Sequence, residues 1–206
     1  MADETYRTVA GRGRATFEVQ GSEFIGHAAP AADRDEAEAF VADIRAEYDD
    51  ATHNVPAYRV RTGGDILREY GDDDGEPSGS AGKPALNVLQ QEAVENVVAV
   101  VTRYYGGTNL GVGGLARSYS SAVKDAIEDA GITEERPHER FAITVEYDDS
   151  GTVRGILESE DADFEADYGE RADFEVRVPK AEGEGLRDRI RSATSGRADI
   201  DDDPGE

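Results

Sequence analysis

The chain has 206 residues, of which 46 are acidic and 22 basic, and its formal net charge of −24 is extreme for a folded protein of this length. It contains no cysteine, which excludes a disulfide framework, a thiol nucleophile and any cysteine-ligated metal site. A surface so rich in carboxylates is typical of a halophilic protein in a high-salt cytoplasm, where a Debye length of about 3 Å at 1 M screens the repulsion between them.

The first part of the chain predicts two strands, a helix and a third strand. Residues 14–19 alternate between apolar and polar, and residues 24–28 form a short apolar run after a turn. A capping-box-like pair of acids opens a helix over 33–49, where apolar residues recur at helical spacing. Residues 53–61 are expected to form the next strand.

Two glycine-rich loops then flank a buried strand. The first loop covers 71–83 and leads into a short helix over 84–93. The unbroken β-branched run within 96–104 predicts a strand buried on both faces, at the centre of a sheet. A second loop over 105–114 precedes a helix that carries Leu115 and ends at a glycine.

The remaining chain predicts a second, smaller domain. Its periodicities follow the order strand, helix, strand, strand, helix, with a last strand near 197–200, which is the order of a ferredoxin-like unit. We therefore expect an α+β protein with a first domain over 1–132, a linker over 133–139, a ferredoxin-like α/β-plait domain over 140–201 and a disordered tail over 202–206.

One window of this acidic chain is nearly free of acids. Residues 77–124 contain only Glu92 and Glu95 as acids, and the bases of the window are Lys83, Arg103, Arg117 and Lys124. Burial accounts for part of this window, because its central valines belong to a core strand. The glycine loops with their serines, threonines and cations point instead to an anionic partner that acids would repel, bound in part by free N–H groups at a helix start.

The familiar nucleotide and hydrolase motifs do not fit these loops. Residues 80–84 fail the P-loop pattern, since Pro84 replaces its Ser or Thr. Residues 111–116 fit a relaxed dinucleotide pattern but begin too far from the preceding strand. Residues 78–82 have Ser78 where a nucleophile elbow needs glycine.

Metal and cofactor sites are not predicted either. The three histidines are widely spaced, and the acid cluster at 72–74 is interpreted as a solvated loop, although carboxylates there would suit a hard cation. We expect no metal and no cofactor. The candidate ligand- or phosphate-binding residues are Glu76, Ser78, Ser80, Lys83, Arg103, Tyr104, Gly107, Asn109, Gly111, Gly113, Gly114 and Arg117, and His53 is a further candidate.

The two loops carry a resemblance to a known family. Residues 73–84, with the sequence DDGEPSGSAGKP, and residues 100–119, with the sequence VVTRYYGGTNLGVGGLARSY, resemble the IMPACT family, whose bacterial and archaeal members are called YigZ-type proteins. Residues 51–59 also look like the family, and the resemblance covers roughly 17–130. It implies a first domain like domain two of a small-subunit ribosomal protein, and many YigZ-type members add a ferredoxin-like domain. The acidic surface departs from that of bacterial relatives.

What the resemblance implies about function is a link to translation. Eukaryotic members act in translational control, and prokaryotic members are usually inferred to bind nucleic acid or the ribosome. We therefore expect a non-enzymatic binding or regulatory protein that engages RNA, a ribosome-associated partner or a regulatory protein at the acid-poor loops.

Two alternatives stay open at this point. One is an enzyme that acts on a small phosphorylated or nucleotide substrate held at the glycine-rich loop. The other is a protein-docking face, at which small residues permit close approach to another subunit. The start of the chain lacks the features of a signal peptide and no run approaches the ~18 apolar residues of a membrane span, so we expect a cytoplasmic protein without membrane contact.

Overall fold

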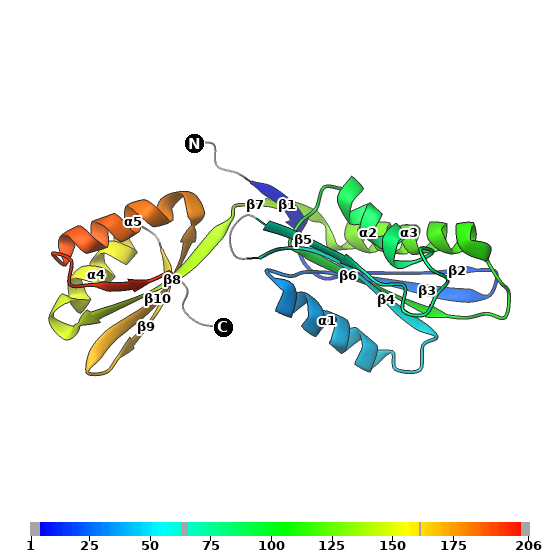
Figure 1. Cartoon of the computed structure of the whole chain (residues 1–206), viewed down its shortest axis with the longest axis horizontal. Coiled ribbons are helices and arrows are strands. Elements are labelled where there is room, and N and C mark those ends of the chain that lie inside the picture. Colours follow the sequence, from blue (N-terminus) through cyan, green and yellow to red (C-terminus); the bar gives the residue numbers. More distant parts are fainter. Residues whose placement is uncertain (1–4, 63–65, 161, 203–206) are drawn as a thin grey trace. The chain divides into compact units, whose positions relative to one another are not determined.

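The computed structural model describes residues 5–62, 66–160 and 162–202 (Figure 1). The chain divides into two compact units, one over residues 6–135 and one that begins at Arg136. Each unit has its own sheet and its own hydrophobic core. In the part of the chain that the structure describes, no helix combines the length and the apolar character needed to cross a membrane.

The first unit is built on a five-stranded antiparallel sheet in the order β2-β3-β6-β4-β5. Its central strand is the predicted valine-rich one, which is buried on both faces because helices cover both sides of the sheet. The strands are β2 (Gly13–Val19), β3 (Ser22–Pro30), β4 (His53–Thr62), β5 (Ile66–Gly71) and β6 (Val97–Tyr104). A two-residue turn, in which Gln20 and Gly21 both have positive φ, joins β2 to β3.

Helices cover both faces of this sheet (Figure 1), and each face has its own core cluster. Helix α1 (Arg34–Glu47) packs on one face, and Asp33 accepts a hydrogen bond from the backbone N–H of Glu36 at its start, as the capping pair predicts. Helices α2 (Gly82–Gln91) and α3 (Gly111–Ala130) pack on the other face. Helix α3 therefore begins four residues before Leu115, and the second loop is correspondingly shorter than predicted.

Two short strands of the first unit were not predicted from the sequence. Strand β1 (Tyr6–Val9) pairs antiparallel with β7 (Ile132–Glu135) as a small separate sheet. Residues 133–135, which we expected in a linker because they are acidic and precede Pro137, thus form backbone hydrogen bonds to β1. Residues 138–139 of the same expected linker belong to the next strand.

The second unit has the predicted ferredoxin-like topology. Its strands form an antiparallel sheet in the order β11-β8-β10-β9, and α4 and α5 connect them as the second and fifth of six elements. The elements are β8 (His138–Glu146), α4 (Tyr147–Ser159), β9 (Asp163–Tyr168), β10 (Arg171–Pro179), α5 (Lys180–Ala193) and β11 (Asp199–Asp201). Of the expected tail, residues 203–206 lie outside the described residues, and Asp202 accepts a hydrogen bond from Arg187.

Candidate functional site

The two glycine-rich loops lie at the same end of the five-stranded sheet. The first loop (72–81) joins β5 to α2, and the second loop (105–110) joins β6 to α3. The strand register places Arg103, near the end of β6, opposite His53 at the start of β4. His53 and the next residue in turn bind Asp74 of the first loop, at 2.6 Å and 2.7 Å. Residues that are distant in the sequence therefore converge here.

Glu76 of the first loop is the centre of a buried polar cluster. Its Oε1 accepts hydrogen bonds from Arg103 Nη1 at 2.6 Å and from the Tyr119 hydroxyl at 2.7 Å. Its Oε2 lies 3.8 Å from His53 Nε2. Because the backbone carbonyl of Asp74 can only accept, His53 donates to it through Nδ1 and presents Nε2 to Glu76. The cluster ties the first loop to β4, β6 and α3.

Arg103 is buried within this cluster and is engaged through Nη1 and Nη2, whereas its Nε has no hydrogen-bond partner among the described residues. Only 6% of its side chain is exposed, its guanidinium lies against the rings of Phe24 and Tyr105 at 5.5 Å and 5.4 Å, and Nη2 donates to Ser22 Oγ at 3.3 Å. Our expectation of Arg103 as a surface cation for phosphate therefore needs correction. The charge of Arg103 is compensated by Glu76 inside the protein.

Tyr119 is the member of the cluster that the sequence analysis missed. It occupies an apolar position of α3 by helical spacing and is fully buried, with its ring edge-on to Phe24 at 5.4 Å. Burial, followed by the hydrogen bond to Glu76, raises the pKa of Tyr119 well above its ordinary value. Its hydroxyl therefore stays protonated and acts as a fixed donor.

The acid cluster of the first loop folds the loop itself. Asp73 accepts the backbone N–H groups of Gly79, Ala81 and Gly82 at 2.7, 3.1 and 2.8 Å. Burial alone would raise the pKa of Asp73, but these three N–H groups outweigh it and hold that pKa below its ordinary value. Within the described residues, no group of three or more His, Asp or Glu side chains is arranged to hold a metal ion.

The two serines of the first loop have different environments. Ser78 is exposed, whereas Ser80 is completely buried and its Oγ has no hydrogen-bond partner among the residues that the structure describes. Ser80 therefore lies behind the loop surface and not on it.

The second loop packs closely against the turn between β2 and β3. A Cβ atom on Gly106 would approach the backbone of Gly21 within 2.0 Å, so only glycine permits this contact. Tyr104 donates to Asp50 at 2.7 Å, and this hydrogen bond, with burial second, raises the pKa of Tyr104 to about 12. Asn109 accepts a hydrogen bond from the Tyr105 hydroxyl at 3.2 Å.

The other glycine candidates fall into two groups. Gly107 is exposed in the second loop, as expected. Gly111, Gly113 and Gly114 belong to the first turn of α3 and not to the loop, so their N–H groups are those of a helix start. This helix start carries no acid and no side-chain cap.

Three exposed cations share the surface of α2 and α3, and we call Lys83, Arg117 and Lys124 the basic patch. Ser120 Oγ contacts the carbonyl of Pro84 at 3.4 Å, which places the first turn of α2 beside the middle of α3. Arg117 and Lys124 lie three residues before and four residues after Ser120, on the same face of α3. Among the described residues, none of the three cations forms an ion pair.

The helix starts reinforce this positive surface. Helices α1, α4 and α5 carry acids in their first turns, whereas α2 and α3 carry none. The start of α2 is nevertheless capped by Asp73 of the first loop, so α3 alone of these two starts is free of a carboxylate. The side chain of Arg117 also folds back toward the first turn of α3, since its Nη1 would lie 3.4 Å from a Cβ atom on Gly113. The uncapped N–H groups at the start of α3 and the three unpaired cations together suit an extended anion.

Comparison with known proteins matches both units. Residues 20–127 match the Impact N-terminal domain, and residues 143–197 match a domain of unknown function, DUF1949. The chain is 34% identical over 197 residues to the IMPACT family member YvyE of Bacillus subtilis (strain 168), covering 95% of this chain and 90% of that relative. It is 34% identical over 165 residues to the IMPACT family member YigZ of Escherichia coli (strain K12), covering 80% and 81%. A crystal structure of a hypothetical protein matches 98% of this chain and 99% of its own with a TM-score of 0.74 and 29% identity.

Proposed function

Because the chain belongs to the IMPACT family, we propose that it is a non-enzymatic regulatory protein linked to translation, and that it binds RNA, free or within the ribosome, at the basic patch. Family membership fits a regulatory role. The proposal of RNA as the partner rests on the surface chemistry of α2 and α3, and we place the protein in a high-salt cytoplasm.

The observation that carries the proposal is the basic patch itself. The chain has 46 acids against 22 bases, yet these three neighbouring cations form no ion pair among the described residues. Their charge is therefore available to bind an anionic partner. The start of α3, which has no acid in its first turn and no side-chain cap, lies beside these cations. A nucleic-acid backbone offers a row of phosphates that matches such a row of donors.

The chemistry of the buried cluster favours binding over catalysis. Arg103 (through Nη1 and Nη2), Tyr119 and His53 bind Glu76, Ser22 or a backbone carbonyl, so each is engaged in holding the loops together. A catalytic reading would need one of these groups to turn toward a substrate. We infer that the cluster positions the loops and the patch makes the contact.

The test measures binding of single-stranded RNA to the full chain at several KCl concentrations, with fluorescence anisotropy as the readout. The variant Arg117→Gln/Lys124→Gln removes two patch cations and is expected to bind more weakly. Its matched control is Arg154→Gln/Arg189→Gln, which makes the same change of net charge on exposed ion-paired residues of the second unit. Equal loss in both variants, or in neither, would rule out the patch as the RNA site.

A further inference from the structure

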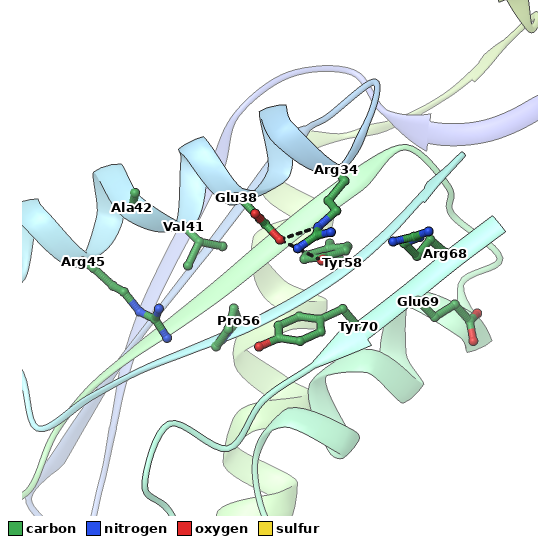
Figure 2. Close-up of a pocket in the computed structure, with 10 residues that line it drawn as sticks. All are labelled: Arg34, Glu38, Val41, Ala42, Arg45, Pro56, Tyr58, Arg68, Glu69 and Tyr70. Carbon is green, nitrogen blue, oxygen red and sulfur yellow. Dashed lines mark hydrogen bonds and ion pairs between the residues drawn. The ribbon is translucent and has the colours of Figure 1, made fainter. Parts of the chain in front are cut away.

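A separate pocket lies on the other face of the first unit's sheet, between α1 and the strands β4 and β5 (Figure 2). Its volume is about 730 Å³, which lies within the roughly 300–1,000 Å³ of small-molecule sites. Helix α1 contributes one wall, and Pro56, Tyr58, Arg68 and Tyr70 of the two strands contribute the other. The basic patch lies on helices that cover the opposite face.

The pocket contains three arginines, of which Arg68 is left without an acidic partner among the described residues. Arg34, Arg45 and Arg68 direct their side chains to it, and Glu38 is the carboxylate among them (Figure 2). Arg45 is paired outside this group, because its Nη2 lies 3.0 Å from Oδ1 of Asp74. Glu38 is engaged by Arg34 Nε at 2.6 Å and lies 3.5 Å from the Tyr58 hydroxyl. Among the described residues, Arg68 has no ion pair or hydrogen-bond partner, so its guanidinium is free for a ligand.

The second carboxylate of the lining does not neutralise these arginines. Glu69 accepts hydrogen bonds from Arg59 at 2.7 Å and from Gln90 of α2 at 2.8 Å. Since side chains alternate along a strand, Glu69 faces α2 whereas its neighbours Arg68 and Tyr70 face α1. Figure 2 shows its carboxylate turned away from the three arginines.

An aromatic wall completes the pocket. Tyr58 and Tyr70 are directly paired across β4 and β5, and their rings stack with centroids 4.9 Å apart and an interplanar angle of 22°. Tyr58 is almost entirely buried, whereas 42% of Tyr70 is exposed. The apolar side chains of Val41 and Ala42 lie on the facing helix. A planar apolar ring would fit between these surfaces.

We propose that this pocket binds a nucleoside phosphate, with the base against Tyr70 and the phosphates at Arg68 and Arg34. Guanidinium groups bind phosphate oxygens through paired N–H donors, and several of them suit a multiply charged group. The stacked tyrosines and the volume select for an aromatic base over a bare inorganic anion. The pocket shares no residue with the basic patch. A failure of RNA binding would therefore not contradict this proposal, and a failure of nucleotide binding would not contradict the proposed RNA site.

The test measures thermal stabilisation of the full chain in high KCl by AMP, ADP, ATP, adenosine and tripolyphosphate. ADP and ATP are expected to raise Tm, and adenosine and tripolyphosphate are expected to do so much less, because each supplies one half of the recognition. Stabilisation by tripolyphosphate equal to that by ATP would overturn the nucleoside assignment. A Tm that no nucleotide changes would overturn the proposal altogether.

Two pairs of variants locate the site. Arg68→Gln and Tyr70→Ala change exposed side chains of the pocket, and each is expected to weaken ATP binding roughly tenfold or more, measured by calorimetry. Arg117→Gln and Tyr105→Ala change equally exposed side chains elsewhere on the same unit and are expected to leave ATP binding unchanged. Loss of ATP binding in the second pair and not in the first would place the ligand at the loops and overturn the pocket assignment.

Discussion

Glu76 and Arg103 form a buried ion pair, with Oε1 2.6 Å from Nη1 and with only 3% and 6% of the two side chains exposed. Glu76 comes from the first loop and Arg103 from the central strand, so the pair fixes the loop against the sheet. Each charge is removed from water and depends on the other for compensation.

Removal of either partner is therefore expected to destabilise the protein strongly. Arg103→Leu or Glu76→Leu leaves one uncompensated buried charge and is expected to lower the free energy of unfolding by roughly 3–5 kcal/mol. The double variant Glu76→Leu/Arg103→Leu is expected to lose less than either single variant. Urea unfolding in high salt measures the free energy of unfolding of all three variants. The control is Arg154→Leu, which breaks an exposed ion pair and is expected to change that free energy by no more than about 1 kcal/mol. Additive losses in the double variant would contradict the pairing.

The hydroxyl of Tyr119 is expected to contribute separately from its ring. Tyr119→Phe keeps the edge-on contact with Phe24 but removes the donor to Glu76, which is expected to lower the free energy of unfolding by roughly 1.5–3 kcal/mol. Tyr104→Phe removes a hydroxyl that is bonded to exposed Asp50 and is expected to have a smaller effect. A spectrophotometric titration checks the second assignment, because Tyr104→Phe should remove a tyrosine with a pKa of about 12.

Sequence periodicity was sufficient for the main elements but not for their partners. The capped helix at 33–49 and the valine-rich strand were predictable because each has a sustained period and a recognisable boundary. The pair β1 and β7 was not, because each strand has only four residues and its partner lies over a hundred residues away. Short strands of this kind depend on backbone pairing that no local pattern encodes.

The candidate site was predictable as a region and not as a set of contacts. The acid-poor window led to the two loops and to the cations of the basic patch. Arg103 was misassigned to the surface, although its place directly after six buried residues of one strand was a signal of burial. The pocket beneath α1 was missed entirely, since Arg34 and Tyr70 come from elements that only the fold brings together.

His27 is expected to make stability fall in mild acid. Burial, together with the nearby charge of Arg14, lowers the pKa of His27 from 6.5 to about 4. Glu47 acts in the opposite direction, but its effect on this pKa is weaker. The folded state thus keeps His27 neutral, and between pH 6.5 and 4 the unfolded state binds the proton more readily, so stability decreases as pH falls through that window. The full loss is roughly 3 kcal/mol for this shift.

Chemical denaturation across that pH range tests the assignment in a His27→Gln variant. The substitution can lower stability at every pH, but it is expected to flatten the slope between pH 6.5 and 4. His138→Gln changes an exposed histidine and is expected to keep the slope. If the His27→Gln variant retained the same slope, another group would be responsible.

Asp73 is expected to control the local stability of the first loop. Because its pKa is depressed in the folded state, its contribution is present above the ordinary pKa of an aspartate and is lost as pH falls through the lower folded value. Asp73→Ala removes the acceptor of three backbone N–H groups, so amide exchange at Gly79, Ala81 and Gly82 is expected to accelerate by about tenfold or more. Hydrogen exchange followed by NMR measures each amide.

Two further variants separate the three bonds. Asp73→Asn retains one acceptor oxygen, which can serve the two amides that share Oδ1, while its NH₂ group faces Gly79. Exchange is therefore expected to accelerate mainly at Gly79. Asp72→Ala removes the acceptor of a single amide, that of Asp74, and is expected to leave the other three protected. Equal acceleration of the three amides in Asp73→Asn would show that the carboxylate charge, and not the individual hydrogen bonds, holds the loop in place.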